Sequence, residues 1–166
     1  MHPILSKITD NHADAGPWGM EQSTSIDIAA SPARVWEVLS NVEHWSDWTA
    51  SVRWVRRIDE GPLRSGSQAK ISQPRIPTVD WTVTDLDPAS GFTWISTAPG
   101  ATTTARHTLE SLPGGGTRVT LSVEQAGLIG SLVGRLYAGL TDRYLAMEAA
   151  GLKAACEGTG KAGPQD

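Results

Sequence analysis

The most regular hydrophobic pattern lies near the C-terminal end of the chain. From Leu128 to Cys156, directly after Gly127, apolar residues recur at steps of three and four, which is the period of one helical face. We therefore predict one long amphipathic helix, roughly 40 Å in length at about 1.5 Å per residue. Its apolar stripe should pack against the rest of the domain. The stripe contains Ile129, Leu132, Val133, Leu136, Leu140, Tyr144 and Met147.

Upstream of this segment, apolar and polar residues alternate with a period of two. Ile26 and Ile28 alternate with their neighbours in this way, which predicts a first strand over residues 25–29. Six more strands are predicted between turns rich in Gly and Pro, and such short connections make neighbouring strands antiparallel. These strands are expected over residues 52–59, 67–73, 78–86, 92–97, 102–112 and 118–125.

Two short helices are expected between the first two strands. Ser31 is a helix N-cap, and Pro32 stands at the first helical position, where its missing N–H costs nothing. Asn41 begins a second short helix that ends near Trp48. The order is therefore one strand, two short helices, six strands and one long helix, which is an α+β domain with an antiparallel sheet.

Length and charge narrow the possible partners. The 166 residues suggest one domain, over residues 20–157, with a flexible N-terminal arm (1–19) and a disordered tail (158–166). The net charge of −4 argues against binding to nucleic acid. No run of about 18 apolar residues predicts a membrane span, and the first residues lack a signal-peptide pattern. With a single cysteine, Cys156, and scattered histidines, we expect a cytoplasmic protein with no disulfide, metal or cofactor.

Three segments of the chain resemble a known family. They are the strand and helix start from Ile26 to Trp36, the sequence Trp45-Ser46-Asp47-Trp48, and the stretch from Leu86-Asp87-Pro88 to Phe92-Thr93-Trp94. With the element order, they are similar to the START-like, or SRPBCC, helix-grip superfamily, and especially to its polyketide cyclase/dehydrase and lipid-transport branch. The resemblance covers about residues 21–157.

The resemblance implies a helix-grip fold. In such a fold a curved seven-stranded antiparallel sheet wraps around the long C-terminal helix, with two short helices between strands 1 and 2. An apolar cavity for a hydrophobic small molecule is expected between sheet and helix. Members of the superfamily include lipid carriers, aromatase/cyclases, hydrolase-like proteins and hormone receptors, and the fold alone does not choose among these functions.

Strand alternation predicts which side chains face the cavity. In the strand over 102–112, Thr103, Ala105 and His107 share one face, and Arg106 lies on the other. The same argument applied to the other strands and to the helix stripe gives the expected ligand-binding residues. They are Trp54, Ile71, Gln73, Trp81, Val83, Trp94, Thr103, His107, Leu136, Leu140 and Tyr144.

Two residues are candidates for catalysis. His107 in a cavity could act as acid or base near neutral pH, or it could be a structural histidine bonded to a neighbouring strand. Asp80 is expected on the face opposite Trp81, which argues against a His-Asp pair. Arg75 stands in a hairpin turn, where it could bind a carboxylate or enolate oxygen or simply be solvated.

Three functions fit this sequence. The first is a binding module that encloses a hydrophobic or aromatic, lipid-like or polyketide-like small molecule without a cofactor. The second is a polyketide cyclase/dehydratase-type enzyme that uses His107 and Arg75. The third is a partner protein that uses the fold for protein contacts. For all three functions we expect a monomer or homodimer. Gly130, Gly134 and Gly139 in the long helix indicate either close packing on the sheet or a mobile segment that opens the cavity.

Overall fold

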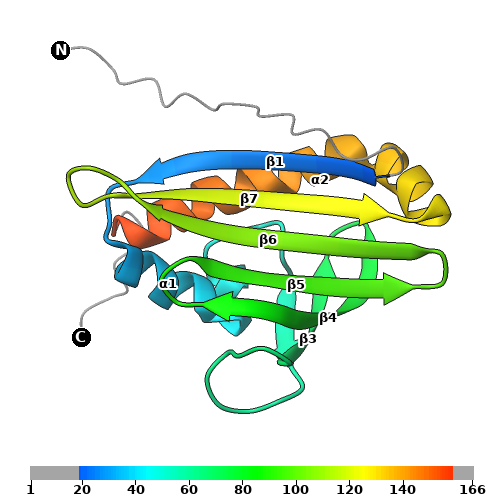
Figure 1. Ribbon diagram of the computed structural model, residues 1–166, viewed down its shortest axis with the longest axis horizontal. Coiled ribbons are helices and arrows are strands. Elements are labelled where there is room, and N and C mark those ends of the chain that lie inside the picture. The colour runs from blue at the N-terminus through cyan, green and yellow to red at the C-terminus, as the bar shows by residue number, and fades with distance from the viewer. Residues whose placement is uncertain (1–18, 159–166) are drawn as a thin grey trace.

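A seven-stranded antiparallel sheet forms one layer of the structure, and a long C-terminal helix packs against it (Figure 1). The computed structural model describes residues 19–158. The elements are β1 (Gly19–Ile28), α1 (Pro32–Ser40), the 3₁₀ helix η1 (Val42–Asp47), β2 (Trp54–Arg57), β3 (Gln68–Gln73), β4 (Ile76–Asp87), β5 (Gly91–Ala98), β6 (Ala101–Ser111), β7 (Thr117–Ala126) and α2 (Leu128–Cys156).

The strand order in the sheet is β1-β7-β6-β5-β4-β3-β2, so strands β2 to β7 form a meander and β1 joins it beside β7. The two short helices α1 and η1 connect β1 at one edge to β2 at the other edge. Helix α2 packs mainly against β1 and β7 and less extensively against β6 and α1. This is the helix-grip arrangement expected from the sequence: an α+β fold with a curved open sheet and one long helix.

Strand β1 begins at Gly19, six residues before the strand predicted from alternation. It pairs with β7 along its whole length, from Gly19 opposite Ala126 to Ile28 opposite Thr117. The first part of β1 forms a strand without apolar alternation, because backbone pairing with β7 and polar contacts hold it in place. Gln22, for example, donates from Nε2 to the Ala138 carbonyl of α2 at 2.8 Å.

The short helices form as their capping residues predict. The Ser31 hydroxyl accepts a hydrogen bond from the Arg34 N–H at 3.2 Å and caps α1. The buried residues of α1 are Val35 and Leu39. In η1, Trp45 is only 2% exposed, and its indole N–H donates to the Leu39 carbonyl at 2.9 Å. The indole therefore joins the two helices to the core.

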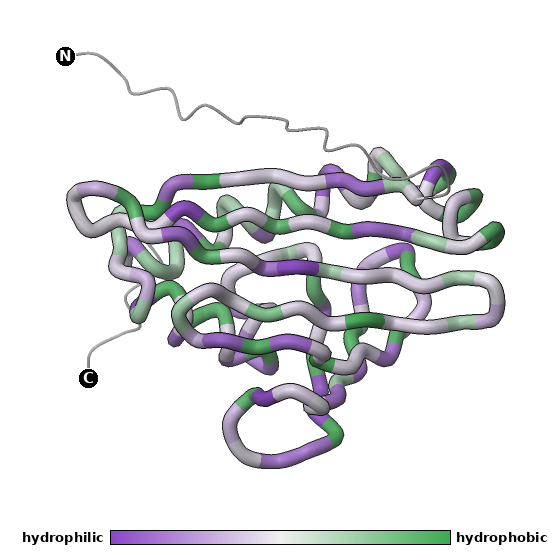
Figure 2. The backbone as a smooth tube through the Cα atoms, viewed as in Figure 1, coloured by the Kyte–Doolittle hydropathy of each residue, from purple (hydrophilic) through white to green (hydrophobic). Residues whose placement is uncertain are grey.

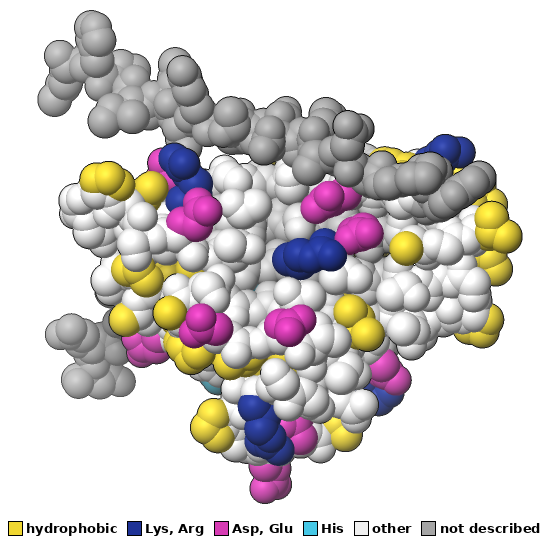
Figure 3. Space-filling view, viewed as in Figure 1, with side chains coloured by type: hydrophobic (Ala, Val, Ile, Leu, Met, Phe, Trp, Pro, Cys, Tyr) yellow, Lys and Arg dark blue, Asp and Glu magenta, His cyan; other side chains and the backbone are white. Residues whose placement is uncertain are grey.

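The predicted orientation of α2 is wrong in its first half. Leu128 is 85% exposed, Leu132 60% and Leu136 74%, although the last two belong to the expected buried stripe. We call the exposed apolar residues of this half the outer stripe. Figures 2 and 3 show hydrophobic residues at the end of the molecule where α2 begins. The outer stripe consists of Leu128, Ile129, Leu132, Val133, Leu136 and Tyr137.

Small residues set the face of α2 that meets the sheet. A Cβ on Gly130 would lie 3.4 Å from the Ala101 Cα, and one on Gly134 would lie 2.3 Å from the Gln125 side-chain oxygen. Close packing is thus the role of these two glycines, whereas Gly139 faces open space. The larger apolar residues beside the glycines point outward. The buried face of α2 contains Gly130, Gly134, Tyr144, Leu145, Ala149, Leu152 and Cys156.

The outer face of the sheet is polar. Figure 3 shows charged side chains scattered over the visible face, with hydrophobic side chains mainly toward its margins. Ion pairs join neighbouring strands there, such as Arg106 with Glu124 at 2.8 Å. Residues 1–18 of the expected N-terminal arm (1–19) and residues 159–166 of the expected tail (158–166) lie outside the described residues. Within residues 19–158, no helix is long and apolar enough to cross a membrane.

Candidate ligand-binding site

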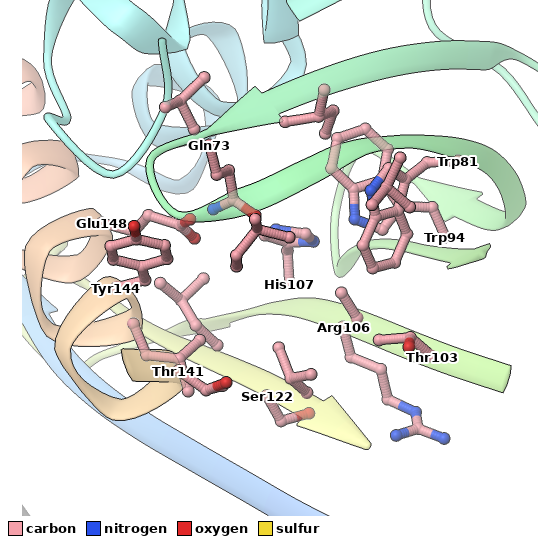
Figure 4. Close-up of a pocket in the computed structure, with 18 of the residues that line it drawn as sticks. Gln73, Trp81, Trp94, Thr103, Arg106, His107, Ser122, Thr141, Tyr144 and Glu148 are labelled. Carbon is pink, nitrogen blue, oxygen red and sulfur yellow. The ribbon is translucent and has the colours of Figure 1, made fainter. Parts of the chain in front are cut away.

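A cavity of about 150 Å³ lies between the inner face of the sheet and the second half of α2 (Figure 4). Strands β3 to β7 supply one wall and α2 supplies the other, while Trp45 and Val52 contribute from the segment between α1 and β2. The lining residues are Trp45, Val52, Ile71, Gln73, Ile76, Val79, Trp81, Trp94, Thr103, Ala105, Arg106, His107, Leu121, Ser122, Val123, Gln125, Thr141, Tyr144, Leu145 and Glu148.

One end of the cavity is aromatic. The rings of Trp81 and Trp94 have centroids 5.5 Å apart and planes inclined by 33°. Trp45 packs on Trp94 at 5.2 Å. Offset aromatic rings at these separations attract one another and form a rigid wall. Figure 4 shows Trp81 and Trp94 on one side of His107 and Tyr144 and Glu148 on the other, so the aromatic and polar ends are separate.

His107 faces the cavity, as strand alternation predicts. It is 5% exposed, and its ring stacks on Phe92 with centroids 4.3 Å apart and planes inclined by 11°. Burial lowers the pKa of His107 to about 4, although a backbone hydrogen bond with Phe92 opposes this shift. The imidazole is therefore neutral at physiological pH. Its Nδ1 atom is buried and has no hydrogen-bond partner among the described residues.

Glu148 is a cavity residue that the sequence analysis missed. Ser51 donates from its hydroxyl to a Glu148 carboxyl oxygen at 3.2 Å, and the Ser51 and Thr49 hydroxyls are 2.9 Å apart. Burial raises the pKa of Glu148 to about 7, and the Ser51 hydrogen bond opposes this shift. A signal was present in the sequence, because Glu148 lies one helical turn after Tyr144 and so shares its face.

The structure brings seven of the eleven predicted ligand-binding residues to the cavity wall. They come from five elements: two each from β3 and β6, and one each from β4, β5 and α2. Besides Glu148, the wall contains further polar residues that the sequence analysis did not select, including Ser122, Gln125 and Thr141. The seven predicted residues in the wall are Ile71, Gln73, Trp81, Trp94, Thr103, His107 and Tyr144.

The other four predicted residues do not line this cavity. Leu136 is exposed and Leu140 is half-buried outside it, because the face of α2 is rotated by about one residue, or about 100°, from the predicted stripe. Trp54 lies under the Arg56 guanidinium at 5.0 Å from the ring centroid. Val83 is 2% exposed and belongs to the packed core.

Arg75, the predicted oxyanion partner, also lies outside the cavity wall. It is exposed in the two-residue turn between Gln73 and Ile76 and has a positive φ of 65°. The backbone of this turn contacts the helix, because the Tyr144 hydroxyl donates to the Pro74 carbonyl. This hydrogen bond ties α2 to the β3–β4 hairpin at the edge of the cavity.

Charge is distributed unequally between the cavity and the outer face. Arg106 is the sole Lys or Arg in the described cavity wall, and its guanidinium pairs with Glu124 at 2.8 Å; Figure 4 shows its side chain directed away from His107. Asp80 is exposed and pairs with Lys70 at 2.7 Å, so it does not orient His107. Among residues 19–158, no group of three or more His, Cys, Asp or Glu could hold a metal ion.

The fold and this cavity define a helix-grip protein with an internal apolar site. Several solved structures have a similar fold. The Zhui aromatase/cyclase from Streptomyces sp. R1128 matches with a TM-score of 0.62 and 18% identity over 86% of this chain and 93% of its own. The protein TTHA0849 from Thermus thermophilus matches with a TM-score of 0.67 and 16% identity over 86% of this chain and all (100%) of its own.

A third structure is the di-domain ARO/CYC BexL from the BE-7585A biosynthetic pathway. It matches with a TM-score of 0.62 and 15% identity over 83% of this chain and 46% of its own length. Residues 21–157 match the family model described as polyketide cyclase/dehydrase and lipid transport. The chain belongs to this family. No curated protein sequence matches it.

Proposed function

We propose that this protein binds a small hydrophobic or aromatic molecule in the cavity between the sheet and the second half of α2. The observation that carries the proposal is the cavity wall itself, where the Trp81–Trp94 pair stands opposite a few polar groups on α2. Ligand sites are commonly apolar clefts with a small number of polar groups that fix orientation. Family membership supports the same class of function.

The size of the cavity restricts the ligand. Sites for drug-sized ligands measure roughly 300–1,000 Å³, whereas this cavity measures about 150 Å³. An apolar cavity of about 150 Å³ in another protein binds benzene. The conformation described here therefore suits a molecule of one or two rings better than a long lipid or an extended polyketide chain.

A second candidate function is catalysis of the polyketide cyclase/dehydratase type. The observation that favours it is the presence of two buried titratable groups in one cavity, with pKa values displaced in opposite directions, His107 to about 4 and Glu148 to about 7. Such pairs are common where one group acts as acid and another as base. In this version Glu148, and not Arg75, would be the partner of His107.

Filling the cavity tests whether it is the binding site. Thr103 lines the cavity, and its neighbour Thr104 alternates to the outer face, so Thr103→Phe and Thr104→Phe form a matched pair. Native mass spectrometry of freshly purified protein should detect a bound small molecule in the wild type and in Thr104→Phe but not in Thr103→Phe. Equal retention of the molecule by both variants would contradict the proposal.

A substitution at His107 separates binding from catalysis. For a binding protein, His107→Ala should weaken the affinity by about one hydrogen bond, on the order of 1 kcal/mol. For an enzyme, the same change should lower turnover by about 10²-fold or more with little change in binding. Measuring both quantities on the captured molecule decides between the two functions.

A further inference from the structure

We infer that the cavity selects an uncharged molecule of one or two fused rings that carries a hydroxyl group, and that it rejects carboxylates and phosphates. This inference rests on the proposed function and adds the chemical class of the ligand. The rings would lie at the Trp81–Trp94 end, and the hydroxyl group would point past His107, which lies between the two ends, toward Glu148.

The charges around the cavity exclude an anion. The guanidinium of Arg106 is held by Glu124 and directed away from His107, and no other Lys or Arg lines the described cavity wall. His107 is neutral, whereas Glu148 contributes a carboxyl group that becomes negative as it ionises. A buried carboxylate or phosphate without a cationic partner is strongly unfavourable, and a nearby carboxylate increases that cost.

Polar groups in the wall call for a group that can both donate and accept a hydrogen bond. The Nδ1 atom of His107 is buried and has no hydrogen-bond partner among the described residues. The unpaired Oε1 atom of Gln125 lies against Gly134 of α2, so it does not bear on the ligand. One Glu148 oxygen accepts from the Ser51 hydroxyl, and the carboxyl group can exchange a further hydrogen bond with a ligand. Buried polar atoms are normally paired, and a hydroxyl group can pair with an acceptor and a donor at once. A hydrocarbon would leave the His107 Nδ1 atom unpaired.

The aromatic end favours a flat ligand. Trp81, Trp94 and Trp45 are fixed by contacts with one another at 5.2 to 5.5 Å, so they present a rigid surface against which a ring can stack. The cavity of about 150 Å³ limits the number of rings. A hydroxylated ring system of one or two rings satisfies size, flatness and hydrogen bonding together.

Four probes test this inference, and three of them each differ from 2-naphthol in one property: the hydroxyl group, the charge or the number of rings. They are 2-naphthol, naphthalene, 2-naphthoate and a three-ring phenanthrol, and equilibrium dialysis against the full chain at neutral pH measures their affinities. We expect 2-naphthol to bind at least about tenfold more tightly than each of the other three, which corresponds to about one well-placed hydrogen bond or charge contact. Equal binding of naphthalene overturns the hydroxyl requirement.

Each of the other outcomes overturns a different part of the inference. Binding of 2-naphthoate as tight as that of 2-naphthol overturns the exclusion of anions, and tight binding of phenanthrol overturns the size limit, while the proposed binding function stands in both cases. If none of the four probes binds, the proposed function fails and the inference fails with it.

A matched pair of variants assigns the exclusion of anions to one residue. Glu148→Gln keeps the shape of the side chain but removes its ionisation. At about pH 8 a carboxyl group with a pKa of about 7 is roughly nine-tenths ionised, so the preference for 2-naphthol over 2-naphthoate should fall there by up to about tenfold. Glu110→Gln makes the same change on an exposed residue of β6 and should leave the preference unchanged. An unchanged preference in Glu148→Gln would show that Glu148 does not face the ligand.

Discussion

The two halves of α2 are both rich in apolar residues, yet they bury different kinds of residue on the same face. In the first half the large residues of the outer stripe face solvent and two glycines face the sheet. In the second half Leu145 and Leu152 are 5% and 0% exposed, and Tyr144 and Glu148 border the cavity. A hydrophobic period thus identifies a helix, but close packing of small residues decides which side meets the sheet.

The largest contrast should appear in stability. Leu152→Ala should lower the free energy of unfolding by roughly 2–5 kcal/mol, because it leaves a void at a fully buried site. Leu136→Ala, in the outer stripe, should change it by less than about 0.5 kcal/mol. Chemical denaturation followed by Trp fluorescence measures both. A loss above about 2 kcal/mol for Leu136→Ala would restore the orientation expected from the hydrophobic stripe.

A pH effect should distinguish the cavity from the rest of the molecule. The folded pKa of Glu148 is raised from 4.5 to about 7, so the folded state retains a proton that the unfolded state releases, and stability falls as pH rises through this range. The folded pKa of His107 is lowered from 6.5 to about 4, so stability falls as pH decreases through that range. The two slopes oppose each other where the ranges overlap.

Glu148→Gln should therefore reveal the slope that His107 produces. Between about pH 4.5 and 6.5 the free energy of unfolding of the variant should rise more steeply with pH than that of the wild type. Above pH 7 it should exceed the wild-type value by up to about 3 kcal/mol. Denaturation at a series of pH values gives both curves. Parallel curves for the variant and the wild type would show that Glu148 titrates normally in the folded protein.

Glycine substitutions compare the same helix at two positions. A Cβ on Gly151 would lie 2.1 Å from the Trp48 carbonyl oxygen, so Gly151→Ala should destabilise the protein by about 1–3 kcal/mol. No atom lies within 4 Å of a Cβ on Gly139, so Gly139→Ala should stabilise the helix by up to about 1 kcal/mol. Thermal unfolding of both variants is sufficient, and a shift of the same sign in both would contradict the packing described here.

The smallest effect is expected at the edge of the cavity. Tyr144→Phe removes the hydrogen bond to the Pro74 carbonyl and should cost about 1 kcal/mol, with the ring still in place. Hydrogen exchange of the β3–β4 turn should increase in this variant and not in Tyr137→Phe, which alters a tyrosine of the outer stripe. Unchanged exchange in Tyr144→Phe would mean that this hydrogen bond does not hold the turn.

Most of the fold could be predicted from the sequence because it depends on local signals. The Ser31-Pro32 helix start, the turns and strand alternation gave the element order and the inward position of His107. The first part of β1 could not be predicted in this way, because its partner strand β7 is distant in the sequence and its own side chains are mostly polar.

The site was predictable mainly where strands form it, and Tyr144 is the one residue of α2 that was correctly predicted in the wall. Alternation has a fixed period of two, so Trp81, Trp94 and Thr103 could be assigned to one face of the sheet. On α2, two neighbouring faces carry apolar residues, and the choice between them depends on the contacts of Gly130 and Gly134 with the sheet. Leu136 was selected for that reason, whereas Glu148 was missed because the selection followed apolar residues and passed over a charged residue on the face of Tyr144.

The two apolar regions of α2 also give the most direct test of the binding proposal, because a hydrophobic probe could bind at either one. Intermolecular NOEs between unlabelled 2-naphthol and isotope-labelled protein report which side chains contact the probe. The account predicts NOEs to the rings of Trp94 and Tyr144 in the cavity wall. NOEs to Leu132 and Leu136 of the outer stripe instead, with none to Trp94, would contradict it.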